Sequence, residues 1–268
     1  MCFRKVFLWG GFLVVLSGLL SCSIKENRLD CPCHLYLDLS SVSRHAFDSL
    51  DVFLSSQKGT RCLSVPLPED PSAPYLLEVE KSSLLLQVCA LENGTLWLSD
   101  PEEDILKIPM GQQCPPVFTH FSYLDTRGDE CMEKIQLRKN FCTLDITMVG
   151  NDPTQDYPFS LWIRGNVNGY DEQGRPNEGV FSVPLYPTRK GKCAVRVPRQ
   201  KDDSLELSLC KNGEVLAEFA LGNYMRMGGY DWSLADLKDI SLKIDCAYLK
   251  IEVEIGLWKE SYHFSVEI

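Results

Sequence analysis

Strict alternation of apolar and polar residues is the feature that most constrains the fold of this chain. Segment 250–255 reads Lys-Ile-Glu-Val-Glu-Ile, and segment 34–39 alternates in the same way. A period of two places apolar side chains on one face of a β-strand and polar side chains on the other. The chain therefore has to build half-buried strands rather than amphipathic helices.

Short segments of this kind recur along the chain, separated by Gly, Pro and Asn. We expect strands at 34–39, 50–54, 61–67, 75–79, 83–91, 117–124 and 131–137, and again at 142–146, 159–163, 180–183, 193–197, 205–210, 215–221, 240–244, 248–257 and 262–268. One helical turn is expected, at 231–237. Many short strands with almost no amphipathic helix predict an all-β fold of antiparallel sandwiches.

The second half of the sequence repeats the first. Three pairs of segments match in the same order: 33–37 with 142–146, 49–50 with 160–161, and 83–89 with 204–210. Single matches of this length are common among strands, but three in one order indicate a tandem repeat. We therefore predict an N-terminal β-sandwich at 33–139 and a C-terminal β-sandwich at 140–268.

The N-terminal segment has the pattern of a bacterial lipoprotein signal. Arg4 and Lys5 precede a continuous apolar run, 6–20, which is short for a bilayer span. The run ends in Leu-Leu-Ser-Cys, which resembles a lipobox with Cys22 as the lipidated residue. The alternatives are an ordinary signal peptide or an uncleaved anchor. The sequence favours a lipoprotein signal peptide at 1–21.

Residues 22–32 are polar and turn-prone, and we expect them to be a flexible leash between the lipid and the folded body. A cysteine that carries more than one acyl chain anchors a protein stably in a membrane. Lys25 and Glu26 resemble the surface-export signal of lipoproteins in Gram-negative anaerobes. The expected location is the cell outer membrane, lipid-anchored through Cys22 and exposed on the surface.

Composition excludes some partners. The net charge of −10 argues against nucleic acid and against adhesion to anionic lipid head groups. Twelve cysteines indicate an exported chain, and an even number is left when Cys2 is removed and Cys22 is lipidated. Cys31 and Cys33 are the candidate disulfide cysteines, although some cysteines can be buried thiols that pack as small apolar residues.

No catalytic motif is found in the sequence. The four histidines are scattered, and neither a His-Glu-x-x-His zinc motif, a Gly-x-Ser-x-Gly elbow nor a phosphate-binding loop occurs. We therefore expect no enzymatic activity, no cofactor and no metal. Two clusters have a second interpretation. Asn166, Asn168, Asp171 and Glu172 are expected at a hairpin tip rather than around a cation, and Trp97, Trp162, Trp232 and Trp258 form either core or a glycan platform.

Both ends of the chain resemble a known family. Segment 28–35, behind the leash of Cys22, is similar to the opening of the fimbrillin-associated anchor lipoproteins of minor fimbriae, and segments 230–232 and 237–245 are similar to their closing part. The resemblance implies two tandem transthyretin-like (Greek-key) β-sandwich domains. It also implies an outer-membrane lipoprotein that anchors a fimbrium, binds fimbrial (pilin) subunits and assists assembly or length control.

Other functions remain open at this stage. The alternatives are an accessory or tip subunit of a fimbrium, a surface glycan-binding lipoprotein that stacks sugars on tryptophans, and a lipid-tethered hydrolase. The hydrolase is disfavoured because no nucleophile–base pair is evident.

The C-terminal segment is a candidate partner-binding strand. Tyr262, Phe264 and Val266 alternate with polar residues in a segment that is free at one end. Extended segments of this kind can add to the sheet edge of a partner and fill a groove there. The other interpretation, which the sequence favours slightly, is that 262–268 is the last strand of its own domain.

Overall fold

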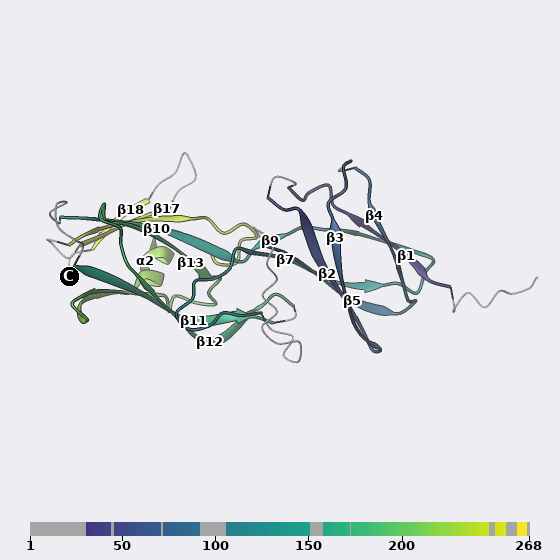
Figure 1. The fold of residues 1–268 in the computed structure, drawn as a ribbon, viewed down its shortest axis with the longest axis horizontal. Helices are drawn as coiled ribbons and strands as arrows, with labels where there is room; N and C mark the ends of the chain where they lie inside the picture. Colours follow the sequence, from purple (N-terminus) through teal and green to yellow (C-terminus); the bar gives the residue numbers. More distant parts are fainter. Residues whose placement is uncertain are drawn as a thin grey trace, which may run out of the picture.

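A computed structural model describes residues 31–43, 46–70, 72–91, 106–150, 158–171, 173–246, 250–255 and 262–266. These residues form two β-rich domains that lie end to end (Figure 1). The predicted signal peptide, most of the leash and Cys22 lie outside the described residues. No helix in the described part of the chain is long and apolar enough to cross a membrane.

The first domain consists of two sheets. Its strands are β1 (Cys33–Asp38), β2 (Ser49–Ser56), β3 (Gly59–Pro66), β4 (Tyr75–Val79), β5 (Ser83–Leu91), β7 (Val117–Asp125), β8 (Glu130–Lys134) and β9 (Arg138–Lys139). One sheet has the order β4-β1-β8, and the other has the order β3-β2-β5-β7-β9. Their inner faces share one core that contains Leu35, Leu37, Val52, Leu86 and Val88, as the alternation predicts.

The second domain is larger. Its strands are β10 (Phe141–Val149), β11 (Phe159–Tyr170), β12 (Pro176–Leu185), β13 (Lys192–Pro198), β14 (Glu206–Lys211), β15 (Glu214–Phe219), β16 (Ile240–Asp245), β17 (Lys250–Ile255) and β18 (Tyr262–Val266). The sheets have the orders β13-β10-β16-β17-β18 and β12-β11-β14-β15, and β6 (Leu106–Lys107) pairs with β11. The core contains Ile146, Leu161, Leu207 and Ile251, as predicted. The side chain of Val253, expected there too, lies outside the description.

The two domains share one strand topology. The order β4-β1-β8 corresponds to β13-β10-β16, and β3-β2-β5-β7 corresponds to β12-β11-β14-β15. In each domain the first strand pairs antiparallel with the fourth and parallel with the seventh. The predicted all-β class of tandem sandwiches is therefore confirmed. The two parallel pairs were not predicted, because alternation within a strand says nothing of its neighbour's direction.

Turn chemistry explains one of the hairpins. Lys211 and Glu214 are paired, so Asn212 and Gly213 form a two-residue loop between β14 and β15. Both have positive φ, 53° and 85°, as a type I′ turn requires. Asn and Gly tolerate this region of backbone space, and the turn matches the twist of the strands that it joins. The corresponding Asn-Gly of the first half lies outside the described residues.

The predicted helical turn at 231–237 is wrong. The helix of the second domain is α2 (Leu221–Met227), in which Leu221 and Met225 are one turn apart and fully buried. Residues 231–237 instead begin with a turn in which the Asp231 carboxylate accepts a hydrogen bond from the Ser233 amide, 2.8 Å. An aspartate that bonds the main chain two residues on favours a turn over a helix.

One segment of the first half packs in the second domain. Ile108, Cys114 and Val117 are at most 3% exposed and belong to the second core. The Ile108 amide donates to the Asn168 carbonyl of β11, 2.7 Å. The predicted N-terminal unit, 33–139, includes this segment, so the chain crosses into the second domain and returns before β7.

A buried arginine holds the connection between the domains. Arg199 is 5% exposed, and its guanidinium donates to the carbonyls of Lys139 (2.7 Å), Leu234 (2.8 Å) and Trp232. Its Nε also donates to Oδ1 of Asn140, 3.1 Å. These bonds tie the end of β9 and the connector after it to the loop that follows α2, so these main-chain carbonyls have a hydrogen-bond donor.

Candidate partner-binding surfaces

The N-terminal cysteines differ in environment. Cys31 is exposed, whereas Cys33 in β1 is fully buried. Burial raises the pKa of the Cys33 thiol, and the neighbouring Cys131 on β8 raises it further. Cys31 and Cys33 are both free thiols. A disulfide of Cys31 or Cys33 stays a prediction, as does lipidation of Cys22, which lies outside the description.

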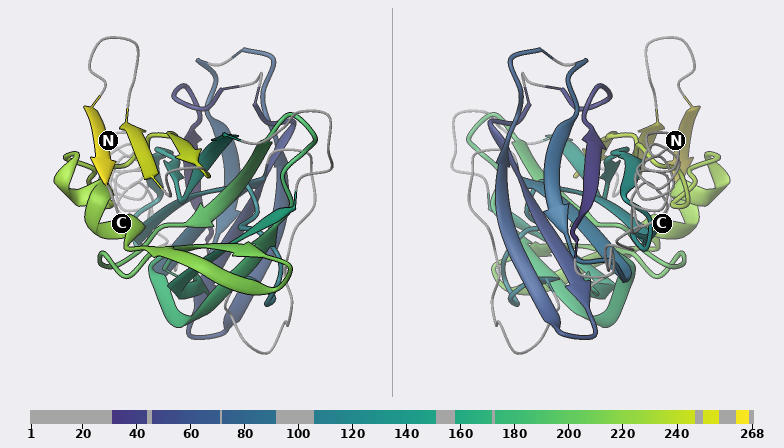
Figure 2. Two further views of the ribbon diagram at one scale, coloured as in Figure 1. Left: turned by 90° about the vertical axis from the view of Figure 1, so that its left-hand side faces the viewer. Right: turned by 90° about the vertical axis from the view of Figure 1, so that its right-hand side faces the viewer.

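The C-terminal strand pairs within its own domain. β18 runs antiparallel to β17, with Tyr262, Phe264 and Val266 opposite Ile255, Val253 and Ile251. It is the outermost strand of the five-stranded sheet (Figure 2). This arrangement corresponds to the alternative in which the segment closes its own domain, and donation would require β18 to leave β17. Donation therefore stays a hypothesis.

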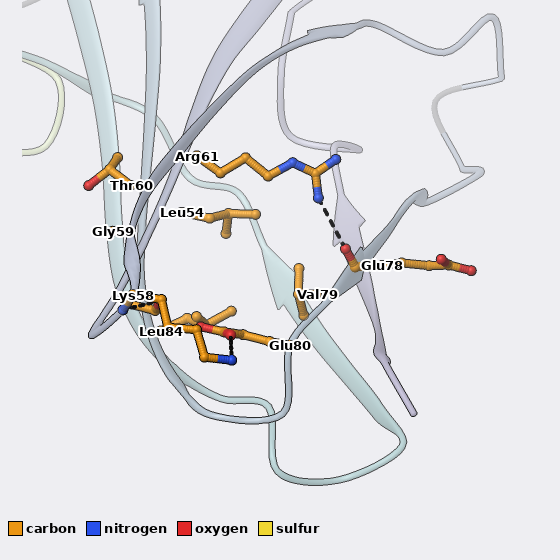
Figure 3. Close-up of a pocket in the computed structure, with 10 residues that line it drawn as sticks. Leu54, Lys58, Gly59, Thr60, Arg61, Glu78, Val79, Glu80 and Leu84 are labelled. Atoms are coloured by element: carbon orange, nitrogen blue, oxygen red, sulfur yellow. Dashed lines mark hydrogen bonds and ion pairs between the residues drawn. The ribbon is translucent and has the colours of Figure 1, made fainter. Parts of the chain in front are cut away.

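The first domain has a groove between the edge strands of its two sheets. β3 is the edge of one sheet and β4 is the edge of the other. The groove between them has a volume of about 340 Å³, and Leu54, Val79 and Leu84 point into it (Figure 3). These three side chains are each less than 10% exposed and belong to the first core. The groove is thus an opening onto the hydrophobic core.

Charged side chains line the rim of this groove. Nη1 of Arg61 on β3 donates to the carbonyl of Glu78 on β4, 3.3 Å (Figure 3). Nζ of Lys58 lies 2.7 Å from Oε2 of Glu80, and this pairing raises the pKa of the lysine and lowers that of the glutamate. Two exposed side chains therefore bridge an interval that no main-chain hydrogen bond of the described residues spans.

The corresponding flank of the second domain is filled. There the segment after β6 runs between β12 and β13: the Gly111 amide donates to the Ser182 carbonyl (2.8 Å) and the Cys114 amide to the Arg196 carbonyl (2.9 Å). Nε of Arg196 donates back to the Cys114 carbonyl, 2.9 Å. Because the Cys114 side chain is fully buried, the segment seals the core as well as the sheet edges.

A second cavity, of about 500 Å³, lies between the domains. Phe121, Gln136 and Arg138 line it from the first domain, and Gln173 and Arg175 line it from the second. The combination of an aromatic ring, two amides and two guanidinium groups suits a polar ligand with hydroxyl or acidic groups.

An exposed tyrosine contacts two of the residues that line the interdomain cavity, Phe121 and Gln173. Tyr123 is 71% exposed, its ring packs edge-to-face on Phe121 at 5.2 Å, and its hydroxyl accepts a hydrogen bond from Nε2 of Gln173, 3.2 Å. His120 on the same wall lies with Nε2 3.1 Å from Oε1 of Glu133. No sequence motif signals this cavity, because its residues come from separate strands and from a turn.

The histidines and acidic residues form no metal-binding cluster among the described residues. No group of three His, Cys, Asp or Glu side chains could hold a metal ion there. His34 lies 4.0 Å from Glu78 as an isolated pair, and His45 is not described. The expectations of no enzymatic activity, no cofactor and no metal stay predictions.

The candidate oxygen ligands are spread along β11 and the turn after it. Asp171 closes this hairpin: its Oδ1 accepts hydrogen bonds from the amides of Gln173 and Arg175, 2.9 Å each. Asn166 and Asn168 lie within β11, and each has a buried amide oxygen without a hydrogen-bond partner. Glu172 is not described. The turn is the predicted hairpin tip, but the two asparagines precede it.

The tryptophans of the described ranges do not lie on one surface element. Trp232 is half-buried and packs edge-to-face on Tyr230, with the ring centroids 4.8 Å apart, against the second core. Trp162 is half-buried on β11, with the guanidinium of Arg164 6.0 Å from its ring centroid. Trp97 and Trp258 lie outside the description. Core packing is therefore the observed role of Trp232.

Neither a protein-family model nor a curated protein sequence matches this chain. Solved structures with the same fold do exist. A candidate polysaccharide-binding protein from Bacteroides thetaiotaomicron has a TM-score of 0.62 at 11% identity, over 89% of this chain and 98% of that chain. A candidate adhesin from Bacteroides ovatus has a TM-score of 0.57 at 9% identity, over 87% and 95%.

The fimbrial anchor protein Mfa2 from Porphyromonas gingivalis has a TM-score of 0.54 at 13% identity, over 87% of this chain and 99% of that chain. At such identities the likeness shows the fold. The chain is thus a two-domain all-β protein of the class in which a fimbrial anchor and candidate adhesins are found. The resemblance read from the two ends of the sequence is confirmed at the level of the fold.

Proposed function

We propose that this chain is a lipid-anchored outer-membrane protein that attaches a fimbrium to the cell surface and assists its assembly or length control. The observation that carries the proposal is the likeness to the fimbrial anchor Mfa2, which extends over both domains and nearly the full length of that chain. The lipobox-like sequence that ends at Cys22 supports attachment to the membrane.

The architecture suits a load-bearing subunit. Two sandwiches are joined by a connector whose main chain is bound by Arg199, and a hydrogen-bonded connector suits a subunit that transmits force between its partners. Fimbrial (pilin) subunits are the proposed partners. Sheet edges are the natural contact surfaces, because sandwich subunits associate readily by strand addition.

The function is tested by removing the lipid site in fimbriated cells. Cys22→Ala should leave the protein unprocessed or soluble, abolish labelling by a lipid analogue, and release fimbriae into the medium. Cys31→Ala is the matched control, since Cys31 is an exposed thiol on the same N-terminal side and should keep both labelling and attachment. Lipid labelling of the Cys22 variant, or fimbriae that stay on its cells, contradicts the proposal.

Strand donation is tested separately by ending the chain after residue 261. If β18 is donated, with Tyr262, Phe264 and Val266 entering a partner's groove, the truncated protein stays folded and membrane-bound while fimbriae are lost. If β18 only closes its own domain, the truncation destabilises the sheet of β17. Thermal unfolding of the purified chain and counting of cell-bound fimbriae distinguish the two.

A glycan-binding surface protein is the second candidate function. The interdomain cavity, with Phe121, two amides and two arginines, favours it, and a candidate polysaccharide-binding protein shares the fold. Titration with oligosaccharides, compared between the natural chain and Tyr123→Ala, tests it. Binding that the substitution weakens at least about tenfold would support a glycan site.

A further inference from the structure

The turn between β11 and β12 packs closely against the first domain. Gly174 in this turn has a positive φ of 67°, and a Cβ added there would lie 2.9 Å from Oγ1 of Thr119 on β7. Thr119 is only 6% exposed, and its hydroxyl accepts a hydrogen bond from Nδ2 of Asn140, 2.6 Å. The interdomain cavity, which both Thr119 and Gly174 line, is therefore built beside a tight contact between the domains.

The charge of this cavity is opposite to that of the chain. The chain has 37 acidic and 27 basic residues and a net charge of −10. Arg138 from the first domain and Arg175 from the second line the cavity, and no aspartate or glutamate is among the described residues that line it. Glu133, behind the cavity wall, is already paired with His120 at 3.1 Å. Such a lining attracts an anion to an otherwise acidic protein.

Both guanidinium groups keep donors for a ligand. Arg138 donates from Nη2 to the Ser233 carbonyl, 3.0 Å, and Arg175 donates from Nε to Oδ2 of Asp171, 2.7 Å. The other N–H groups of the two guanidinium groups have no hydrogen-bond partner within the described ranges of the chain. A guanidinium can bind an oxyanion through two parallel N–H groups, which gives both affinity and orientation.

We propose that the interdomain cavity binds an anionic sugar, whose acidic group is bound by the guanidinium groups of Arg138 and Arg175. This inference rests on the second candidate function, glycan binding, and names the class of glycan. The ring of Phe121 offers an apolar surface to one face of the sugar, and the amides of Gln136 and Gln173 offer donors and acceptors to its hydroxyls.

The size of the cavity agrees with a sugar of one or a few units. Its volume of about 500 Å³ lies within the range of roughly 300–1,000 Å³ that is usual for small-molecule sites. A carboxylated sugar and a sulfated sugar present the same chemistry to the two arginines, so both belong to the proposed class. An acidic peptide shares the charge, but it does not need the ring and the amides that accompany the arginines.

The experiment measures binding to the full-length chain, purified in detergent, by isothermal titration calorimetry. Three pairs of probes differ only in their acidic group: trigalacturonate and sialyllactose, each with its methyl ester, and galactose 6-sulfate with galactose. At least one acidic probe should bind at least about tenfold more tightly than its neutral counterpart. The pair that shows the difference distinguishes a carboxylate from a sulfate.

Two variants connect the preference to the cavity. Arg138→Gln and Arg175→Gln should each weaken binding of the acidic probe at least about fivefold and leave the neutral probe unchanged. Arg127→Gln is the matched control and should keep the natural affinity. Arg127 is an exposed arginine paired with Asp125, as Arg175 is paired with Asp171, but it does not line the cavity. Thermal unfolding establishes that the variants fold, and Arg175→Gln decides alone if Arg138→Gln does not.

Four results would overturn the inference. They are no binding of any acidic probe, equal affinity within every pair, a loss in Arg127→Gln equal to that in the cavity variants, and tighter binding of a hexaglutamate peptide than of any sugar. Binding of neutral sugars that Tyr123→Ala weakens would keep the second candidate function while this inference fails. Fimbrial anchoring is tested independently by Cys22→Ala.

Discussion

The two domains have the same seven-strand order, but among the described residues only the second has further segments along the edges of β12, β13 and β16. In the second domain the segment after β6 fills the flank between β12 and β13, and the β17–β18 hairpin covers β16. In the first domain the matching flank is the open groove, and β8 has no further strand beside it within the described residues. Topology alone therefore does not decide which surfaces of a sandwich are available to a partner.

The connection from the sixth to the seventh strand, which we call the last crossover, also differs between the domains. In the first domain it spans residues 126–129, and the fully buried Thr126 hydroxyl bonds the carbonyls of Glu80 (2.7 Å) and Ser82 (2.9 Å). In the second domain it spans residues 220–239, contains α2, and relies on Arg199. A short connection is satisfied by one hydroxyl, whereas a long loop needs a side chain with several donors.

The largest loss of stability is expected from replacing Arg199, which binds the long crossover of the second domain. Arg199→Ala leaves the carbonyls of Lys139, Trp232 and Leu234 buried without a donor, which should lower the free energy of unfolding by about 3–5 kcal/mol. Urea unfolding measures the loss, and hydrogen exchange should rise in the second domain and at the connector. Arg164→Ala is the control, with a change within about 0.5 kcal/mol. An equal loss in both variants would contradict the role of Arg199.

The next largest loss of stability is expected at Ile108, and it tests in which domain the segment after β6 is buried. Ile108→Ala creates a cavity in the second core and should cost about 2–4 kcal/mol. Amide exchange should increase in β11 and β14 but not in β2 and β5, although Ile108 precedes β7, β8 and β9 of the first domain in the sequence. Met110→Ala, at a residue 73% exposed, should change stability by less than about 0.5 kcal/mol. Faster exchange confined to the first domain would show that the segment belongs there.

A smaller loss is expected at the short crossover. Thr126→Val keeps the shape but removes the hydroxyl, so the Glu80 carbonyl and the Ser82 amide lose a buried partner. The expected cost is about 1–3 kcal/mol, below that of Arg199→Ala. Urea unfolding measures the loss of unfolding free energy in both variants. A larger loss for Thr126→Val than for Arg199→Ala would contradict the difference between the two crossovers. Amide hydrogen exchange in the Thr126→Val variant should become faster in the first domain only.

The smallest effect concerns the charge pair beside Thr126. Hydrogen bonds from Arg127 lower the pKa of Asp125 to about 2. Because the folded pKa lies below the unfolded value of about 4, the stabilisation is present above pH 4 and is lost as the pH falls toward 2. Both groups are exposed, so the effect on unfolding is small. Carboxylate titration by NMR should show the low pKa, and Arg127→Ala should raise it toward about 4, although the amide of residue 127 still donates to Asp125.

Sequence reasoning located the long strands well because each alternates over its own length. It missed β6 and β9, which are two residues long and carry no periodicity. It also placed the helix at 231–237 instead of α2, since α2 is short and its helical state depends on burial of Leu221 and Met225 in the core. Local pattern decides an element only where the element is long enough to show its period.

The candidate surfaces were harder to predict. Residues at the C-terminus were named as a partner-binding strand because a free, alternating end is visible in the sequence. The groove of Arg61 and Glu78 was not, because its residues lie in separate strands and none is unusual by itself. The interdomain cavity was missed for the same reason.

The sequence by itself determined the all-β class, the duplication of one sandwich and the lipobox-like start, since each depends on neighbouring residues or on a repeated order of segments. Only the tertiary structure decided which edges are covered. Whether residues 108–114 fill one flank, whether β18 pairs with β17, and whether β3 and β4 are left with a groove between them are contacts between distant segments. Such contacts follow from the packing of whole sheets, which no local pattern encodes.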